Sequence, residues 1–282
     1  MTQPKIKKTP CIITKQVFIS IMVLIILLSV VSCSSKQTID YVERPVNEIY
    51  NNAMDLMYQS NYVLAAEQFD EVERQHPYSL WATKAQIMAA YNHYQSSSYD
   101  EAIIAAQRFI ELHPGHKDVG YAHYLIAVCY YEQISDVGRD QSITQLALAS
   151  LDEVVRRFPE TTYARDAKLK TDLARDHLAG KEMSIGRYYL NKGHFVAALN
   201  RFRSVIEQYQ TTSHVPEALH RLVETYLSLG VALEAKAAGA VLGYNYPGSR
   251  WYQDSYQLLV EKNLSPEKNK NSWIQKTFES LF

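Results

Sequence analysis

Glu71-Val-Glu-Arg-Gln-His-Pro77 is a segment in which an amphipathic helix runs into a proline. Proline has no backbone N–H and cannot continue a helix, so the segment predicts a helix end. The same ending occurs in Arg108-Phe-Ile-Glu-Leu-His-Pro114, Glu153-Val-Val-Arg-Arg-Phe-Pro159 and Gly239-Ala-Val-Leu-Gly-Tyr-Asn-Tyr-Pro247. Turn-like sites separate helical stretches at Ser60-Asn61, Ser96-Ser97-Ser98, Lys192-Gly193 and Leu229-Gly230. This recurrence predicts an array of helical pairs.

The pairs resemble the tetratricopeptide repeat (TPR), a 34-residue helix-turn-helix unit. In that unit, small residues at positions 8 and 20 let the helices approach, and large residues at 17 and 24 fill the space between them. The fourth pair matches best, with Gly186, Tyr189, Gly193, Phe195, Ala198 and Phe202. It has Gln210 where the closing proline is expected. The first, second and fifth pairs match less completely.

The third pair is interrupted. Its helices are predicted near 120–134 and 143–158, and Ser135-Asp-Val-Gly-Arg-Asp140 between them is longer than a TPR turn. Five units in register over residues 46–250 nevertheless predict an all-α fold, an α-solenoid of TPR units.

Composition excludes several classes of protein. Hydrophobic residues make up 47% of the 282 residues, which rules out wholesale disorder, and only 10 are glycine, which argues against a turn-rich β fold. The net charge is −1, but residues 1–32 carry four lysines and no acid, so the remainder is acidic by 5 charges. An acidic body argues against nucleic acid as a partner.

The first 33 residues have the pattern of a secretory signal. Lysines precede an apolar run over residues 17–31, which is too short to span a bilayer comfortably, and Val30-Val31-Ser32-Cys33 follows. This resembles a bacterial lipoprotein signal, in which the cysteine becomes the acylated first residue. It implies a signal peptide over 1–32, lipidation (palmitate) at Cys33 and a linker over 33–45. Ser34 implies sorting to the outer membrane of a Gram-negative cell. A plain N-terminal membrane anchor is the alternative.

Tyrosines concentrate on one predicted surface. In a TPR array, positions 2, 5, 9, 12 and 13 of each first helix line a concave groove. In the first three units these positions include seven tyrosines: Tyr50, Tyr58, Tyr91, Tyr94, Tyr121, Tyr124 and Tyr131. Tyrosine combines apolar area with a hydroxyl and is common in binding hot spots. We therefore expect these units to hold an extended, aromatic-containing peptide, although packing between helices is an alternative for any single tyrosine.

Several stretches resemble one family more specifically. These are Arg44-Pro-Val-Asn-Glu-Ile-Tyr50, Asp118-Val-Gly-Tyr121 with the interrupted third unit, and Tyr188-Tyr-Leu-Asn-Lys-Gly-His-Phe-Val-Ala-Ala-Leu-Asn-Arg201. They are similar to the BamD family, lipoproteins of the outer-membrane β-barrel assembly (BAM) complex. The resemblance implies a periplasmic scaffold that binds the periplasmic domains of the central barrel protein, the C-terminal signals of unfolded outer-membrane proteins, and other BAM lipoproteins.

The family match also implies that Arg201 docks the barrel partner, with Arg203 two residues away. The alternative is a solvated face in which Arg203 pairs with Glu207 at i+4. A different function remains open at this point, namely a periplasmic TPR adaptor for envelope division or peptidoglycan enzymes, because fold does not fix function.

The C-terminal region departs from the family pattern. Residues 251–282 comprise a helix end, a polar linker and a tail in which Ile274, Phe278, Leu281 and Phe282 share one helical stripe. The tail either caps the array or binds a partner. No phosphate loop, metalloprotease helix or nucleophile elbow is present, and the cluster around His113 and His116 suits a helix end better than a metal site. We therefore expect no enzyme activity, cofactor or metal.

Overall fold

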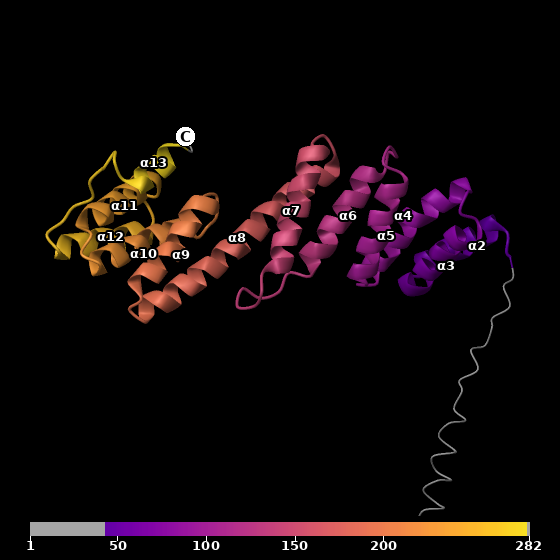
Figure 1. Cartoon of the computed structure of the whole chain (residues 1–282), viewed down its shortest axis with the longest axis horizontal. Coiled ribbons are helices and arrows are strands. Elements are labelled where there is room, and N and C mark those ends of the chain that lie inside the picture. Colours follow the sequence, from indigo (N-terminus) through magenta and orange to yellow (C-terminus); the bar gives the residue numbers. More distant parts are fainter. Residues whose placement is uncertain (1–42, 281–282) are drawn as a thin grey trace, which may run out of the picture. The chain divides into compact units, whose positions relative to one another are not determined.

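The computed structural model describes residues 43–280, and within them all regular structure is helical (Figure 1). The predicted signal peptide, Cys33, most of the predicted linker, Leu281 and Phe282 lie outside the described residues. One compact unit begins at Arg44. Its helices are α2 (Val46–Tyr58), α3 (Tyr62–Gln75), α4 (Leu80–Gln95), α5 (Tyr99–Leu112), α6 (Val119–Glu132), α7 (Ser142–Arg157), α8 (Thr162–Asn191), α9 (Phe195–Gln208), α10 (Val215–Ser228), α11 (Ala232–Asn245), α12 (Arg250–Glu261) and α13 (Trp273–Glu279).

From α2 to α12, each helix packs against the next, and from α2 to α8 the first helix of each pair also contacts the first helix of the following pair (Figure 1). The α2/α3, α4/α5, α6/α7, α8/α9 and α10/α11 pairs are therefore the five predicted units, and the all-α solenoid is confirmed. In the third pair, each observed helix end lies within two residues of the predicted one.

In four of the five pairs, the two helices are joined by the same kind of turn. Ser60, Ser97, Gly193 and Gly230 have φ values of 60°, 61°, 74° and 75°, the left-handed region. In each turn, two backbone N–H groups bond back to carbonyls of the preceding helix, as Ser60 N to Met57 O and Asn61 N to Leu56 O do at 2.9 Å. This is the Schellman pattern, which satisfies carbonyls at a helix end. The turn-like sites in the sequence are thus chain reversals of one geometry.

Helix α8 is 30 residues long and serves two pairs. Its N-terminal part packs against α6 and α7, and its C-terminal part pairs with α9. With Gly186 at position 8, the predicted fourth unit begins at residue 179, so the earlier residues of α8 were not assigned to any repeat. Thr161 caps the helix start, its hydroxyl accepting from the N–H of Ala164 at 3.2 Å, and no proline interrupts the following residues. The third and fourth units are therefore joined by continuous helix rather than by a loop.

The 135–140 insertion is fixed against α8. The ammonium group of Lys181 donates to the carbonyl oxygens of Gly138 and Arg139, at 3.0 Å each. Within the insertion, the carboxylate of Asp136 accepts from the N–H of Gly138 at 2.6 Å. The interruption of the third unit is thus an ordered loop that covers the middle of the long helix.

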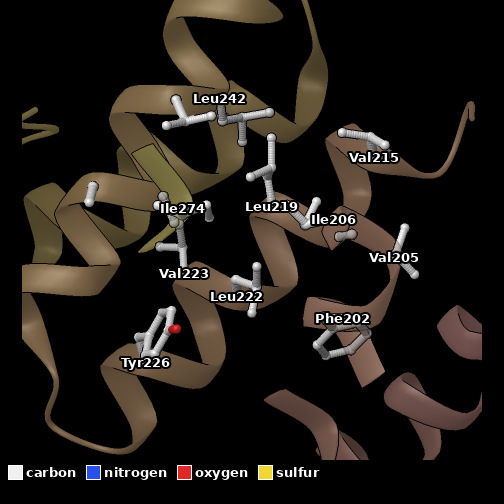
Figure 2. Packing of buried hydrophobic residues seen from close by; sticks show 14 of the residues in the cluster. Phe202, Val205, Ile206, Val215, Leu219, Leu222, Val223, Tyr226, Leu242 and Ile274 are labelled. Atoms are coloured by element: carbon white, nitrogen blue, oxygen red, sulfur yellow. The ribbon is translucent and has the colours of Figure 1, made fainter. Parts of the chain in front are cut away.

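The largest core lies in the fourth and fifth units and includes the C-terminal tail (Figure 2). Ile274 of α13 is fully buried beside Val223, and Phe278 is nearly so. The indole N–H of Trp273 donates to the hydroxyl of Tyr226 at 2.8 Å. The tail therefore caps the array on the side of α9 and α11, as solenoid ends require.

Close approach in the fourth pair depends on Gly186. A Cβ atom there would lie 2.4 Å from Cε1 of Phe202, whose ring is fully buried and cannot move away.

We predict that Gly186→Ala lowers the free energy of unfolding by about 1–3 kcal/mol through overpacking, despite alanine's better helix propensity. Urea denaturation measures the change. Gly115→Ala, where a Cβ meets nothing within 4 Å, is the matched control and changes stability by less than about 0.5 kcal/mol. Equal effects of the two would contradict the packing argument.

Candidate peptide-binding groove and docking face

Tyrosines of α4 and α6 gather with one tyrosine of α8. The ring centroids of Tyr121 and Tyr163 are 5.3 Å apart, and those of Tyr124 and Tyr163 are also 5.3 Å apart in a stacked arrangement. Burial raises the pKa of Tyr121, and the neighbouring Tyr91 and Tyr94 of α4 add to this effect. All five side chains are half-buried. We call this set, Tyr91, Tyr94, Tyr121, Tyr124 and Tyr163, the aromatic cluster.

Helix α8 contributes two further residues, Asp166 and Lys170, that contact the predicted tyrosines and that the repeat positions did not predict. The hydroxyl of Tyr124 donates to a carboxylate oxygen of Asp166 at 2.6 Å, and the ammonium group of Lys170 donates to the same oxygen at 2.8 Å. Lys170 also lies 5.5 Å from the centroid of the Tyr131 ring. These residues were missed because residues 162–178 match no TPR position. The i, i+4 spacing of Asp166 and Lys170 was the available signal.

Burial and charge set the protonation of this cluster. Burial raises the pKa of Tyr121 well above its ordinary value. Burial and the hydrogen bond to Asp166 do the same for the pKa of Tyr124. Burial opposes ionisation of Asp166, yet hydrogen bonds from Lys170 and Tyr124 outweigh it and lower the pKa of that carboxyl. At neutral pH Tyr121 and Tyr124 therefore keep neutral phenol groups beside the ionised carboxylate of Asp166.

Tyr50 and Tyr58 form a second group on α2. The Tyr50 ring packs against Phe69, with centroids 5.4 Å apart, and against Trp81, at 4.7 Å. Burial raises its pKa. Tyr58 is 74% exposed. The seven predicted tyrosines thus divide into two groups: Tyr50 and Tyr58 on α2, and Tyr91, Tyr94, Tyr121, Tyr124 and Tyr131 on α4 and α6.

The C-terminal part of the array has different chemistry at the same repeat positions. Arg187 donates to both carboxylate oxygens of Glu217, at 3.1 and 3.0 Å. Met183 and His220, which the repeat register assigns to the groove, are buried. Trp251 of α12 lies over His220, with ring centroids 5.3 Å apart. Helix α12 therefore covers the fifth unit and limits the open groove there.

The predicted docking arginines lie on α9. The guanidinium group of Arg201 pairs with Glu182 of α8 at 3.1 Å and remains 43% exposed. Arg203 pairs with Glu207 at 2.7 Å, and its guanidinium carbon lies 4.5 Å from the centroid of the Trp273 ring. Both side chains are 43% exposed, so each arginine leaves one side open to a partner, and Arg203 in addition lies over the Trp273 ring of the C-terminal tail.

The remaining chemical groups of the described residues have structural surroundings. His113 contacts the side-chain oxygen of Gln86 at 2.9 Å, and His116 lies near Asp118. Residues 43–280 contain no group of three or more side chains that could hold a metal ion. Cys129 is a fully buried free thiol, and burial raises its pKa to about 12. In the same residues, no helix is long and apolar enough to cross a bilayer.

Comparison with known proteins identifies the family. The family model described as YfiO, Outer membrane lipoprotein, matches residues 42–242. The chain is 52% identical over 251 residues to the outer membrane protein assembly factor BamD of Caulobacter vibrioides, covering 88% of this chain and 82% of that protein. This chain belongs to the BamD family. The BamD of Rickettsia prowazekii is 47% identical over 227 residues, 80% of this chain and 90% of that protein.

The match to BamD proteins agrees with the residues that suggested it, since the family model spans all but the last few residues of the five helical pairs. Among solved structures, the P58(IPK) TPR domain covers 83% of this chain and 64% of its own at 14% identity, with a TM-score of 0.40. That score is too low to add to the argument. The last helices, α12 and α13, lie beyond the residues that the family model matches.

The burial of His220 predicts a pH dependence of stability. Burial lowers its pKa below 6.5, although Glu224, Asp254 and Glu217 oppose this and Arg221 reinforces it. The unfolded state therefore binds a proton before the folded state does, so this contribution to stability is full well above pH 6.5, falls as pH drops below 6.5, and levels off below the lowered pKa of the folded state. His123 adds a decrease of the same sign. Urea denaturation from pH 7.5 to 5 measures it.

His220→Gln tests the assignment. Glutamine keeps a polar group for the hydroxyl of Ser255, which lies 2.8 Å from Nδ1 of His220, but it does not titrate. The variant is expected to show a shallower pH dependence than the parent protein. An unchanged slope would mean that other groups carry the effect.

Proposed function

We propose that this protein is a lipid-anchored scaffold of the outer-membrane β-barrel assembly machinery. It is attached at Cys33 to the periplasmic leaflet of the outer membrane. Its groove holds C-terminal signals of unfolded outer-membrane proteins, and its fourth and fifth units dock on the periplasmic domains of the central barrel protein. Family membership supports this setting, because the similar proteins are named outer membrane protein assembly factors.

The aromatic cluster is the observation that carries the substrate part of the proposal. Its five half-buried phenol groups lie on neighbouring helices, where they offer apolar area and hydroxyl groups to a bound chain. Lys170 lies over Tyr131 at the edge of the cluster; one N–H of its ammonium group donates to Asp166, and the others can donate to a terminal carboxylate. An aromatic C-terminal peptide has both features that this surface complements.

The docking part rests on the exposed side of Arg201. Its partner Glu182 fixes the guanidinium group on the α8/α9 surface, so that a partner carboxylate can bind it with little loss of side-chain entropy. The neighbouring α13 adds Trp273 and its stacked Arg203 to the same region. Other lipoproteins of the complex bind the remaining faces.

The proposal assigns no reaction to this protein. The titratable groups described above are either buried or held in ion pairs, and the named relatives are assembly factors. The alternative of an adaptor for envelope division or peptidoglycan enzymes has no specific support from the groove or from the relatives.

Peptide binding tests the aromatic cluster. Tyr91→Ala and Tyr124→Ala are each expected to weaken the binding of short peptides with C-terminal aromatic residues by roughly tenfold or more, because each removes a central aromatic contact. Fluorescence anisotropy with a labelled peptide measures the dissociation constant. Tyr188→Ala, at a 59% exposed tyrosine on the C-terminal part of α8, is the control and should leave binding unchanged. If all three variants bind equally well, the groove assignment is wrong.

A charge exchange tests the docking role of Arg201. Arg201→Glu alone places two carboxylates together, so loss of binding could reflect local distortion. The double variant Glu182→Arg, Arg201→Glu restores the internal ion pair but reverses its outward charge. We predict that it folds normally yet no longer recovers the barrel protein in affinity purification from solubilised outer membrane. Full recovery by the double variant would remove Arg201 from the docking surface.

A further inference from the structure

The connection between α3 and α4 together with the first residues of α4, here called the 77–81 loop, carries the two most exposed large apolar side chains of the described residues. Tyr78 is 101% exposed and Leu80 is 88% exposed, and Trp81 beside them is 37% exposed. A side chain with full exposure touches no other part of the protein. Tyr78 and Leu80 therefore contribute almost nothing to packing, although transfer of either side chain out of water would lower the free energy.

The fold does not require these residues. Tyr78 follows the helix-closing Pro77, and the corresponding positions after the second, third, fourth and fifth pairs are Gly115, Glu160, Thr211 and Gly248. The loop's structural residue is Ser79, whose hydroxyl caps α4 by accepting from the N–H of Ala82 at 3.1 Å. A tyrosine and a leucine in a position otherwise held by small or polar residues indicate an external partner.

The loop presents these side chains rigidly. The N–H of Ser79 donates to the carbonyl oxygen of His76 at 3.0 Å, which closes the turn. The Trp81 ring packs against Tyr50 at 4.7 Å, and the ammonium group of Lys84 lies 5.5 Å from its centroid. A surface fixed in this way loses little conformational entropy when it binds.

The N-terminal tether begins beside this loop. The backbone N–H of Arg44 donates to the side-chain oxygen of Gln75 at 2.8 Å, and its carbonyl oxygen lies 2.6 Å from Nε2 of His76. Eleven peptide steps separate Arg44 from Cys33, which limits their distance to about 40 Å even in a fully extended chain. If Cys33 is acylated, as proposed above, the loop is held within reach of the bilayer.

The charge of the segment is compatible with a phospholipid surface. Between Glu73 and Asp100 the sequence contains no acidic residue, and exposed Lys84 adjoins Trp81. Tyrosine and tryptophan favour the headgroup region of bilayers, where an apolar ring and a polar group are both accommodated. Protruding side chains suit a soft interface better than an extended peptide, which requires a concave surface.

We propose that the 77–81 loop inserts Tyr78 and Leu80 into the headgroup region of the membrane that carries the lipid anchor. A single point of attachment at residue 33 does not by itself fix the orientation of the array. A second contact at this loop fixes how the first unit faces the membrane, and therefore the direction in which the aromatic cluster faces. The proposal rests on a membrane anchor at residue 33 but concerns a different part of the chain.

A fluorophore at position 78 tests the insertion. The mature lipidated protein, which begins at Cys33, carries Tyr78→Cys and is labelled with the environment-sensitive dye NBD, since Cys129 is buried and acylated Cys33 is blocked. It is then placed on vesicles of phosphatidylethanolamine and phosphatidylglycerol. NBD emission should shift to the blue and be quenched by nitroxide-labelled lipids. Leu233→Cys, at a 67% exposed leucine of α11, is the control and should show neither effect.

Failure of the anchor and failure of the loop contact are distinguishable. Mass spectrometry of the mature protein reports acylation directly. Should Cys33 be unmodified, a hexahistidine sequence at that position and nickel-chelating lipids supply the same tether, and the label still reports on the loop. A water-like spectrum from position 78 on either tether overturns the inference. So does a blue shift that requires an aromatic peptide instead of vesicles.

A second variant measures the contribution of Leu80. In the NBD-labelled Tyr78→Cys protein, Leu80→Ser should lower the ratio of inserted to water-exposed label by about tenfold, because one large apolar side chain no longer enters the membrane. Leu233→Ser in the same labelled protein is the matched control and should leave that ratio unchanged. An effect of equal size from both serine substitutions would overturn the assignment of the contact to this loop.

Discussion

The structure depends on how closely the two helices of each pair approach. In the fourth pair this is set by a glycine against a phenylalanine, Gly186 and Phe202, at a distance that leaves no room for even a methyl group. In the first pair Ala53 and Phe69 are both fully buried at the same repeat positions. Because small residues on one helix let large residues on the other fill the space between them, each pair forms its own core. The remaining side chains of the first helices are then free to form a groove.

Helix α8 shows how such an array departs from strict repetition. A helix of 30 residues is about 45 Å long, so it can serve two pairs without a loop between them. Its N-terminal part contributes Tyr163, Asp166 and Lys170 to the surface formed by α4 and α6. Continuity of this helix therefore connects the aromatic part of the array mechanically to the part that carries Arg201.

The sequence predicted the helical pairs and their turns because both have local causes. Proline or a left-handed residue follows most of the helices of the pairs, and these signals act within a few residues. Even Gln210, which replaces a closing proline, leaves the ending unchanged, since Tyr209 has φ −131° and ψ 44°, close to the values of His76 and His113 at other helix ends. The partners of Tyr124 could not be predicted in this way. Asp166 is 42 residues away and comes from a segment with no repeat signature.

The burial of Met183 and His220 has a similar explanation. Repeat position predicts which face of a helix a residue occupies, but exposure depends on what packs against that face. In the first three units the facing space is open enough to leave the tyrosines half-buried, whereas Trp251 of α12 lies over His220 of the fifth unit. Half-buried aromatic side chains therefore remain accessible on α4, α6 and the start of α8, whereas α12 covers the corresponding face of the fifth unit. The packing of α12 thus determines which repeat positions stay exposed, and the proposed peptide site falls on the part of the array that α12 leaves uncovered.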